Sequence, residues 1–276
     1  MTRSLRLPEV SGDLRPILKW AGGKRWLADS LPNVFVGDFN RFVEPFVGSG
    51  AMFFALQPKR AWLNDVNRDL MEMYTQLKAD WRPVYDLLRR YHSKHSTDFY
   101  YAMRGQIPSD RIHRAARFIY LNRTCFNGLY RVNLKGIFNV PKGTKTSVVF
   151  SDDNFEGVSS ALRRTRLTNF DFSRVLHNCG EGDLVFVDPP YTINHNLNGF
   201  LKYNENLFSW TDQIRLRDAA FDAKQRGAKV IVSNANHRSI RDLYRDCGEL
   251  IVAHRHSVLA ADSFKRRATS ELIILV

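Results

Sequence analysis

The chain has 276 residues, of which 44% are hydrophobic, so it can bury a sizeable core and is not a disordered polypeptide. Its 41 Lys and Arg residues outnumber 28 Asp and Glu residues, and the net charge of +13 favours a polyanionic partner, nucleic acid first, over an ordinary basic enzyme. The three cysteines are far apart and form no CxxC pair, so neither a disulfide framework nor a thiolate zinc site is suggested. The N-terminal residues contain no apolar core of signal-peptide length, and no run in the sequence approaches the length of a membrane span, so a cytoplasmic protein is expected.

Short apolar runs predict seven strands, and helical patterns separate most of them. The runs lie at 41–46, 60–65, 165–172, 184–188, 229–234, 250–256 and 271–276. This alternation predicts an α/β sheet with helices on both faces. One helix has a clear start, because Ser209 and Asp212 have the spacing of a capping box, and Gly227 is placed to end it.

The distance from the first strand to Asp188 predicts an insertion. About 140 residues separate them, whereas three strand–helix steps need only about 75–90. Helical patterns fill most of this span, and residues 130–140 (YRVNLKGIFNV) alternate like a hairpin that turns at Lys135-Gly136. A mostly helical insertion at 66–150 therefore interrupts a sheet domain formed by 1–65 and 151–276.

The segment PILKWAGGKRWLADSLP (16–32) crowds Trp20 and Lys24 around two glycines. It is either an amphipathic N-terminal helix with a flexible turn, or a loop that presents a flat ring and a cation to a ligand. Composition alone leaves both readings open.

The stretch FVEPFVGSGAMFFAL (42–56) predicts a strand, a glycine turn and a helix. Small residues there let a ligand approach the backbone, although a turn of this kind is by itself a weak signal. No Lys-Ser/Thr follows as in a P-loop, which disfavours a triphosphate. Asp65 follows the next strand about 20 residues later and can accept both ribose hydroxyls; the alternative is an N-cap for the helix from Asn67. We favour the ribose role.

The region from Arg111 to Ser151 contains no acidic residue. Its eight basic residues are Arg111, Arg114, Arg117, Arg123, Arg131, Lys135, Lys142 and Lys145, and aromatic residues are interleaved with them. Such a pattern is typical of segments that grip phosphates and probe bases, and a solvated basic face is the alternative. Phe118 and Tyr120 are expected in the core, and Phe126 in a turn that enters a base stack.

The stretch DLVFVDPPY (183–191) predicts a buried strand that ends on Asp188 at the carboxyl edge of the sheet. The Asp188 carboxylate and the Pro189 carbonyl could accept the two hydrogens of one exocyclic base amine, and Tyr191 could stack on the base. Read alone, the stretch is better explained as a rigid exit from a strand with a buried aromatic. No metal site is expected, since His254 and His256 have no acid or cysteine at ligand spacing, and no Ser or Cys nucleophile motif is found.

Six motifs taken together resemble the Dam-type DNA adenine-N6 methyltransferases, the D12 class. They are, in the family's order, LKWAGGK (18–24), FVEPFVGSGA (42–51), LNDVN (63–67), FIYLNRTCFNGLYRVNLKGIFNVPKG (118–143), NFDF (169–172) and DPPY (188–191). The resemblance covers nearly the whole chain. It implies a Rossmann-like class I methyltransferase sheet, a mostly helical target-recognition insertion that ends in a β-hairpin, S-adenosylmethionine as cofactor and double-stranded DNA as partner.

The resemblance also implies roles for individual residues. For the cofactor they are Trp20 and Lys24 as contacts, Glu44, Pro45, Phe46, Gly48 and Gly50 in the turn, Asp65 at the ribose, Asp171 and Phe172 beside the adenine, and Asp188. Asp188, Pro189, Pro190 and Tyr191 are expected to hold the flipped target adenine. For DNA they are Lys19, Arg123, Phe126, Asn127, Leu129, Arg131, Asn139 and Pro141, with Phe126 where relatives often carry tyrosine.

The expected reaction is methyl transfer to N6 of adenine after base flipping. The rivals are an RNA or protein-glutamine methyltransferase, which usually lacks a long basic insertion, and a catalytically silent DNA-binding protein, against which Asp65 and Asp188 argue. The segment after Tyr191 (TINHNLNGFLKYNENLFSW) differs from that of GATC-methylating members, which concerns the target sequence more than the reaction. We expect a monomer or weak dimer, and a restriction endonuclease partner is compatible with the resemblance.

Overall fold

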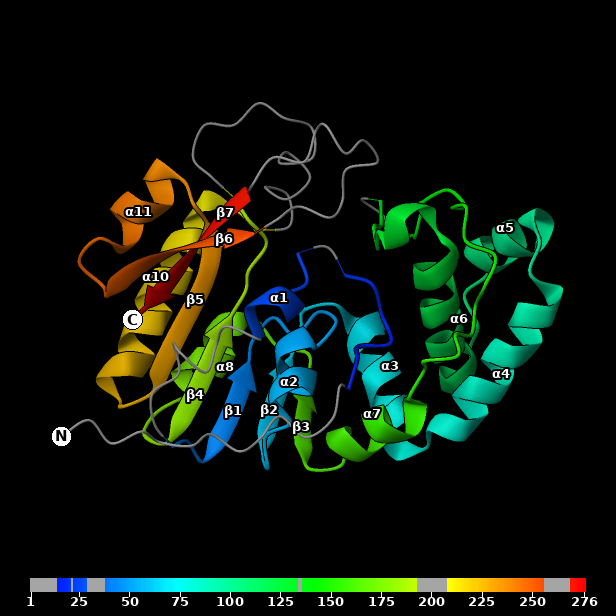
Figure 1. The fold of residues 1–276 in the computed structure, drawn as a ribbon, viewed down its shortest axis with the longest axis horizontal. Coiled ribbons are helices and arrows are strands. Elements are labelled where there is room, and N and C mark those ends of the chain that lie inside the picture. Colours follow the sequence, from blue (N-terminus) through cyan, green and yellow to red (C-terminus); the bar gives the residue numbers. More distant parts are fainter. Residues whose placement is uncertain (1–13, 21, 29–37, 134–135, 193–207, 256–268) are drawn as a thin grey trace. The chain divides into compact units, whose positions relative to one another are not determined.

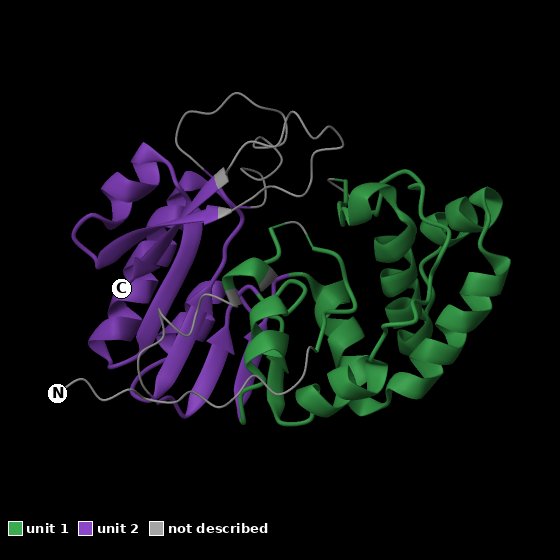
Figure 2. Cartoon of the chain, in the orientation of Figure 1, with its two compact units in different colours: residues 1–37, 47–59, 67–169 green, residues 38–46, 60–66, 170–276 purple. Residues whose placement is uncertain are grey.

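The computed structural model describes residues 14–20, 22–28, 38–133, 136–192, 208–255 and 269–276 (Figure 1). The chain forms two compact units, coloured separately in Figure 2. Unit 1 comprises 1–37, 47–59 and 67–169, and unit 2 comprises 38–46, 60–66 and 170–276. Unit 1 therefore holds all of the expected insertion except Val66, together with two segments that precede it and 19 residues that follow it (151–169). The functional division at 65/66 and 150/151 stays a prediction.

Unit 2 is built on a mixed sheet. Its strands are β1 (Arg41–Glu44), β2 (Ala61–Asn64), β4 (Asp183–Val187), β5 (Lys229–Ala235), β6 (Glu249–Arg255) and β7 (Thr269–Leu275), in the order β2-β1-β4-β5-β7-β6. The first four run parallel, and β7 is antiparallel to both of its neighbours. Val187, the last residue of β4, pairs with Val232, so β5 continues for three residues, 233–235, beyond the end of β4. The predicted α/β fold is confirmed, and the carboxyl ends of the parallel strands share one edge, where such sheets bind ligands.

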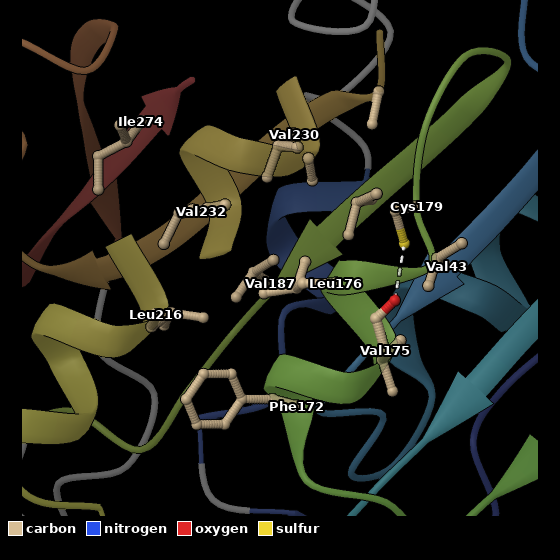
Figure 3. Close-up of a cluster of buried hydrophobic side chains, with 14 of the residues drawn as sticks. Val43, Phe172, Val175, Leu176, Cys179, Val187, Leu216, Val230, Val232 and Ile274 are labelled. Atoms are coloured by element: carbon tan, nitrogen blue, oxygen red, sulfur yellow. Dashed lines mark hydrogen bonds between the residues drawn. The ribbon is translucent and has the colours of Figure 1, made fainter. Parts of the chain in front are cut away.

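Helices cover one face of this sheet through a continuous apolar cluster (Figure 3). Val43, Val187, Val230, Val232 and Ile274 project from the strands, and α8 (Phe172–His177) and α10 (Trp210–Gln225) pack on them with Val175, Leu176 and Leu216. Alternate residues of β5 enter the cluster because successive side chains of a strand point to opposite faces. The last residues of β5 lie beside the end of β4, so the face to which each of their side chains points decides what it can contact there.

The start of α10 confirms the predicted capping box. The Ser209 side chain accepts from the Asp212 backbone N–H, and the Asp212 side chain accepts from the Ser209 backbone N–H. Arg226 is the C-cap, and Gly227 follows it with a φ of 90°. Glycine is favoured at this position because it adopts the left-handed region without a Cβ clash. Helix α11 (Arg238–Tyr244) follows β5.

Unit 1 is mostly helical. Its elements are α1 (Arg25–Ala28), α2 (Ala51–Leu56), α3 (Arg68–Ala79), α4 (Trp81–Lys94), α5 (Thr97–Gly105), α6 (Arg111–Thr124), the 3-10 turn η2 (Phe126–Gly128), α7 (Phe155–Leu162) and β3 (Thr165–Thr168). Asn67, Asp80, Ser96 and Asp110 cap α3 to α6 by accepting hydrogen bonds from first-turn N–H groups. Helix α6 contacts α3, α4 and α5, and Phe118 and Tyr120 on it are buried as expected. None of the helices in the described ranges is long and apolar enough to span a membrane.

Two predicted elements differ in extent. The run at 165–172 is a strand only to Thr168, because the Asp171 side chain accepts from the Ser173 backbone N–H and starts α8. In the described part of the hairpin, Val132 and Phe138 form an isolated antiparallel bridge, and the Asn133 N–H donates to the Ile137 carbonyl at 2.8 Å. The hairpin was predicted to turn at Lys135-Gly136, and Lys135 lies outside the described residues.

Candidate active site and nucleic-acid interface

Three acids lie at or just after the carboxyl ends of parallel strands in unit 2. Glu44 ends β1, Asp65 follows β2 and Asp188 follows β4. Glu44 is only 3% exposed, and the Oδ1 atom of Asp188 is buried. Parallel strands end at a common edge, so the carboxylates predicted from widely separated motifs occupy one edge of the sheet.

The alternative reading of Asp65 is wrong. The N-cap of α3 is Asn67, whose side chain accepts from the Leu70 backbone N–H at 3.1 Å, and the helix begins at Arg68. The capping function therefore falls to a neighbour. Asp65 is partly exposed beyond the end of β2.

Asn64 organises the segments around these acids. Its side-chain amide donates to the carbonyls of Pro45 and Phe170, both at 3.0 Å, and its oxygen accepts from the Phe170 backbone N–H at 2.8 Å. The side chain is fully buried. It ties the turn after β1 to the segment that leads into α8. Sequence reasoning missed this residue; its one signal is a polar side chain at the end of an apolar strand.

Two residues of the turn after β1 adopt a backbone conformation that favours glycine. Gly48 and Gly50 have φ values of 47° and 70°, in the left-handed region that favours glycine. Within unit 1, the Tyr74 hydroxyl donates to the Gly48 carbonyl at 3.0 Å, and a Cβ on Gly48 would lie 2.7 Å from Cδ1 of Trp20. The structure thus brings Gly48 and Trp20, two expected cofactor residues, into direct contact.

Residues 17–20 and 22–24 are not helical, and within the described part of this segment only Arg25–Ala28 forms a helix. The Trp20 ring stacks with Tyr130 and Phe118, at centroid distances of 5.9 and 6.4 Å. Lys24 is 3% exposed, and its Nζ donates to the Gly22 carbonyl at 2.6 Å. The described backbone therefore matches the loop alternative and not the amphipathic helix, whereas the Lys24 cation is buried and is not presented at the surface.

Asp171 and Phe172, the two residues expected beside the cofactor adenine, differ in exposure: Asp171 is exposed and Phe172 is buried. Asp171 is exposed, where it caps α8 and forms an ion pair with Arg215 at 2.9 Å. Phe172 is buried in the apolar cluster and stacks with the half-buried ring of Phe46 at 5.4 Å. Phe46 stands nearer the surface of this pair, so it is the better placed of the two rings to meet a ligand.

The Asp-Pro-Pro-Tyr segment leaves β4 with its tyrosine firmly held. The Tyr191 hydroxyl lies 2.9 Å from Ser233 Oγ and donates to Glu271 Oε2 at 3.0 Å. Burial, followed by the negative charges of Asp188 and Glu271, raises the pKa of Tyr191 well above its ordinary value. The phenol therefore stays protonated and can donate this bond. Neither Ser233 nor Glu271 was expected from the sequence.

A turn in unit 1 gathers five of the residues assigned to DNA. Phe126 is 53% exposed, while its backbone N–H donates to the Pro141 carbonyl at 2.9 Å. Asn127 has a φ of 54°, and Leu129 donates its N–H to the Phe126 carbonyl at 3.2 Å. Gly128 packs so closely on Lys19 that a Cβ would lie 2.8 Å from it.

Asn122 clamps this turn to the Lys19 segment. Its Oδ1 accepts from the Lys19 backbone N–H at 2.9 Å, and its Nδ2 donates to the Lys19 and Gly128 carbonyls at 2.7 and 3.2 Å. Asn122 is fully buried on α6. The clamp explains how two distant segments present Lys19 and Phe126 together. Sequence reasoning missed it, because an amide inside a helix gives no signal of a long-range contact.

Arg131 and Asn139 face each other across the short hairpin. The Arg131 Nε donates to the Asn139 Oδ1 at 3.0 Å, next to the bridge between Val132 and Phe138. Both residues are at least partly exposed. The contact fixes the plane of the Arg131 guanidinium, which is the group expected to read a base.

Arg123 is placed differently from what its assignment to DNA requires. It is 4% exposed, donates to both Asp153 oxygens, and also donates to the carbonyls of Ile17 and Val148. A buried guanidinium with these bonds holds the fold together and has no donor directed to a phosphate. The expected contact of Arg123 with DNA is therefore contradicted by its burial and its internal bonds.

Other arginines of α6 are also engaged internally. Arg114 forms two bonds with Glu72, at 2.7 and 2.9 Å, and Arg117 donates to the Met103 and Arg104 carbonyls. Burial lowers the pKa of Arg117. Several basic residues of the region without acids, Arg114, Arg117 and Arg123, therefore bond within the protein. Among the described residues, no group of three or more His, Cys, Asp or Glu is arranged to hold a metal ion.

Comparisons with known proteins show which family the chain resembles. A family model described as "D12 class N6 adenine-specific DNA methyltransferase" matches residues 20–259. The chain is 36% identical over 243 residues to a Type II methyltransferase of Lactococcus lactis subsp. cremoris, covering 85% of this chain and 86% of that protein. It is 38% identical over 238 residues to a DNA N-6-adenine-methyltransferase of Escherichia phage P1, covering 85% of this chain and 31% of that protein. A DNA adenine methylase of Vibrio cholerae is 31% identical over 266 residues, covering 95% of each.

Proposed function

The chain belongs to the D12 class of N6 adenine-specific DNA methyltransferases, and we propose that its methyl donor is S-adenosylmethionine and its substrate an adenine flipped out of duplex DNA. The observation that carries this proposal is the placement of Asp188, Pro189 and Tyr191 directly after β4, at the ligand-binding edge of the sheet. The Asp-Pro-Pro-Tyr motif is too short to identify an active site by itself, and its position after β4 supports a role in catalysis.

We assign the acceptor role to Asp188 and Pro189. The adenine amine is a poor nucleophile because its lone pair is delocalised into the ring. The Asp188 carboxylate and the Pro189 carbonyl accept its two hydrogens and stabilise positive charge as it develops on the nitrogen, which is electrostatic preorganisation. Tyr191 provides the face on which the flipped base stacks, and the excess proton of the amine passes to solvent.

The residues present fit the proposed cofactor. S-adenosylmethionine supplies a methyl group on a positively charged sulfonium, which leaves as a neutral thioether in a direct displacement. Glu44 offers a buried carboxylate, and Asp65 offers an acid suited to ribose hydroxyls. On unit 1, Gly48 lies against Trp20 with no room for a Cβ, so glycine there lets the turn pack directly on the indole of a second proposed cofactor residue. The remaining residues of the proposed cofactor-binding set are Lys24, Pro45, Phe46, Gly50 and Asp171. Phe172 is buried and stacks against Phe46.

We assign target recognition to the exposed turn and the hairpin of unit 1. The proposed residues are Lys19, Phe126, Asn127, Leu129, Arg131, Asn139 and Pro141. Phe126 enters the base stack beside the target, because an exposed aromatic on a clamped turn can replace a flipped base. Arg131 reads a base edge with a guanidinium oriented by Asn139.

Sequencing that detects N6-methyladenine tests the proposal. The protein is expressed in cells that lack adenine methylation, and their DNA is compared with DNA from cells that express Asp188→Ala. We expect methylated adenines in one sequence context with the natural chain and none with the variant, which should still bind duplex DNA. Absence of N6-methyladenine with the natural chain would refute the function, and methylation near wild-type level with Asp188→Ala would refute the role of Asp188.

A further inference from the structure

The end of β5 lies beside the segment that leaves β4. Because Val187 pairs with Val232 in parallel register, Ser233 and Asn234 run alongside the start of the Asp188–Tyr191 segment. Successive residues of a strand point to opposite faces of the sheet. Both of these polar side chains are fully buried. Ser233 is hydrogen-bonded directly to the segment on one face of the sheet, and Asn234 is linked to it through Gln213 on the other face.

On the first face, three side chains from three elements meet at one hydroxyl. Tyr191 Oη lies 2.9 Å from Ser233 Oγ and donates to Glu271 Oε2 at 3.0 Å. Ser233 Oγ and Glu271 Oε2 are 3.4 Å apart. Glu271 lies on β7, where it pairs with Ala235 of β5, and is 8% exposed. A bond from a phenol to a buried carboxylate is charge-assisted and stronger than a neutral one.

On the second face, a relay of two amides reaches the backbone of the segment. Asn234 Nδ2 donates to Gln213 Oε1 at 3.0 Å, and Gln213 Nε2 donates to the Pro190 carbonyl at 3.4 Å. Gln213 lies on α10 and is fully buried. The segment is therefore held from both sides, more firmly at Tyr191 than at Pro190.

We propose that Glu271, with Ser233, is a positioning residue for methyl transfer: it fixes the Tyr191 ring through its hydroxyl so that the ring and Asp188 keep one mutual orientation. This inference rests on the proposed function, because it concerns the same Asp188–Tyr191 segment. Glu271 does not touch the substrate and acts through Tyr191.

The cost of these buried groups supports a positioning role. Burying a carboxylate, a hydroxyl and two amides is unfavourable unless each is hydrogen-bonded, and apolar side chains would fill the same space more cheaply. A simple exit from a strand needs only the prolines, which already fix φ. The polar cluster instead specifies the direction of one aromatic ring, which backbone rigidity cannot do.

Glu271→Ala and Glu271→Gln separate positioning from mere stability. Glutamine can still accept from Tyr191, whereas alanine cannot. Glu249→Ala on the neighbouring β6 is the matched control, because Glu249 is exposed and pairs with Leu275 of the same β7. Each variant is assayed for kcat, for KM with S-adenosylmethionine, for melting temperature, and for fluorescence of a 2-aminopurine placed at the target position of a duplex.

We expect Glu271→Ala to lower kcat by about tenfold or more, since small misplacements near reacting atoms are costly, while KM for the cofactor stays within about twofold. Glu271→Gln should recover most of kcat, the 2-aminopurine signal of the alanine variant should change, and Glu249→Ala should match the natural chain. An unchanged kcat in Glu271→Ala, or a loss that glutamine fails to restore and that follows the melting temperature, would overturn the inference.

Tyr191→Phe provides the test if Glu271→Ala does not fold. It removes one oxygen and keeps the ring, so it should reproduce the loss of kcat, and wild-type kcat in this variant would equally overturn the inference. If the natural chain itself forms no N6-methyladenine, the proposed function has failed, which is a different result from active protein with unaffected variants.

Discussion

The guanidinium of Arg123 donates to both carboxylate oxygens of Asp153, at 2.6 and 2.7 Å. Their side chains are 3% and 7% exposed, so the pair is shielded from solvent. Arg123 also holds the Ile17 carbonyl, which anchors the segment that leads to Lys19 and Trp20. A basic residue in a basic insertion is thus part of the scaffold behind the proposed DNA-reading surface.

Arg123→Ala should destabilise the protein by about 3–5 kcal/mol, because it leaves the Asp153 carboxylate buried without its partner. Denaturant unfolding measures this change. Arg111→Ala on the same helix is the control, since Arg111 is exposed and lies 3.7 Å from Glu72; it should change stability by less than about 0.5 kcal/mol. Wild-type stability in Arg123→Ala, combined with a weaker salt dependence of DNA binding, would restore Arg123 to the DNA contacts.

Phe126→Ala should lower methylation with little effect on stability. The ring is 53% exposed, and the turn is held by backbone bonds to Pro141 and by the Asn122 clamp, which alanine retains. Loss of an inserted ring raises the cost of flipping the target, so 2-aminopurine fluorescence in the complex should fall. Tyr101→Ala, another exposed aromatic of unit 1, is the control. Equal flipping in both variants would argue against the wedge.

Strands and motifs were predictable because they are local. The apolar run before Asp188 and the capping box at Ser209 and Asp212 follow from the period and spacing of nearby residues, and both appear as expected. The same holds for the exposed position of Phe126, which sits in a turn just after a buried helix.

Side-chain partners could not be predicted in this way. Asn64, Asn122 and Glu271 each join segments that are far apart in the chain, and Arg123 looks like its exposed basic neighbours until Asp153 is brought beside it. Because the region from Arg111 to Ser151 contains no acidic residue, its net charge alone predicts that its arginines bind a partner outside the chain. Tertiary contacts decide which of them bond inside it.

Arg131→Ala should relax the sequence preference of methylation. A bidentate guanidinium–base contact provides about 1–3 kcal/mol of discrimination, and Asn139 orients this guanidinium. Methylation of a pool of duplexes with single base changes around the adenine measures the preference. Arg131→Lys keeps the charge but lacks the planar fork, so it should restore affinity more than selectivity. An unchanged preference in Arg131→Ala would count against the hairpin as the reader.

Gly48→Ala should weaken cofactor binding through Trp20. The new Cβ would lie 2.7 Å from Cδ1 and 2.8 Å from Nε1 of the indole, and the φ of 47° is strained for alanine. The ring must move from its stack with Tyr130, and the strain should cost about 1–3 kcal/mol of stability. Calorimetric titration with S-adenosylmethionine and denaturant unfolding measure the two effects.

Gly105→Ala provides the matched control for that substitution. Gly105 is the last residue of α5, and a Cβ there has no atom within 4 Å. Alanine should leave cofactor affinity unchanged and be neutral or stabilising by up to about 1 kcal/mol, because it favours the helix. If Gly48→Ala binds the cofactor as tightly as Gly105→Ala does, the contact between Gly48 and Trp20 serves folding alone, and the cofactor role proposed for Trp20 loses its structural support.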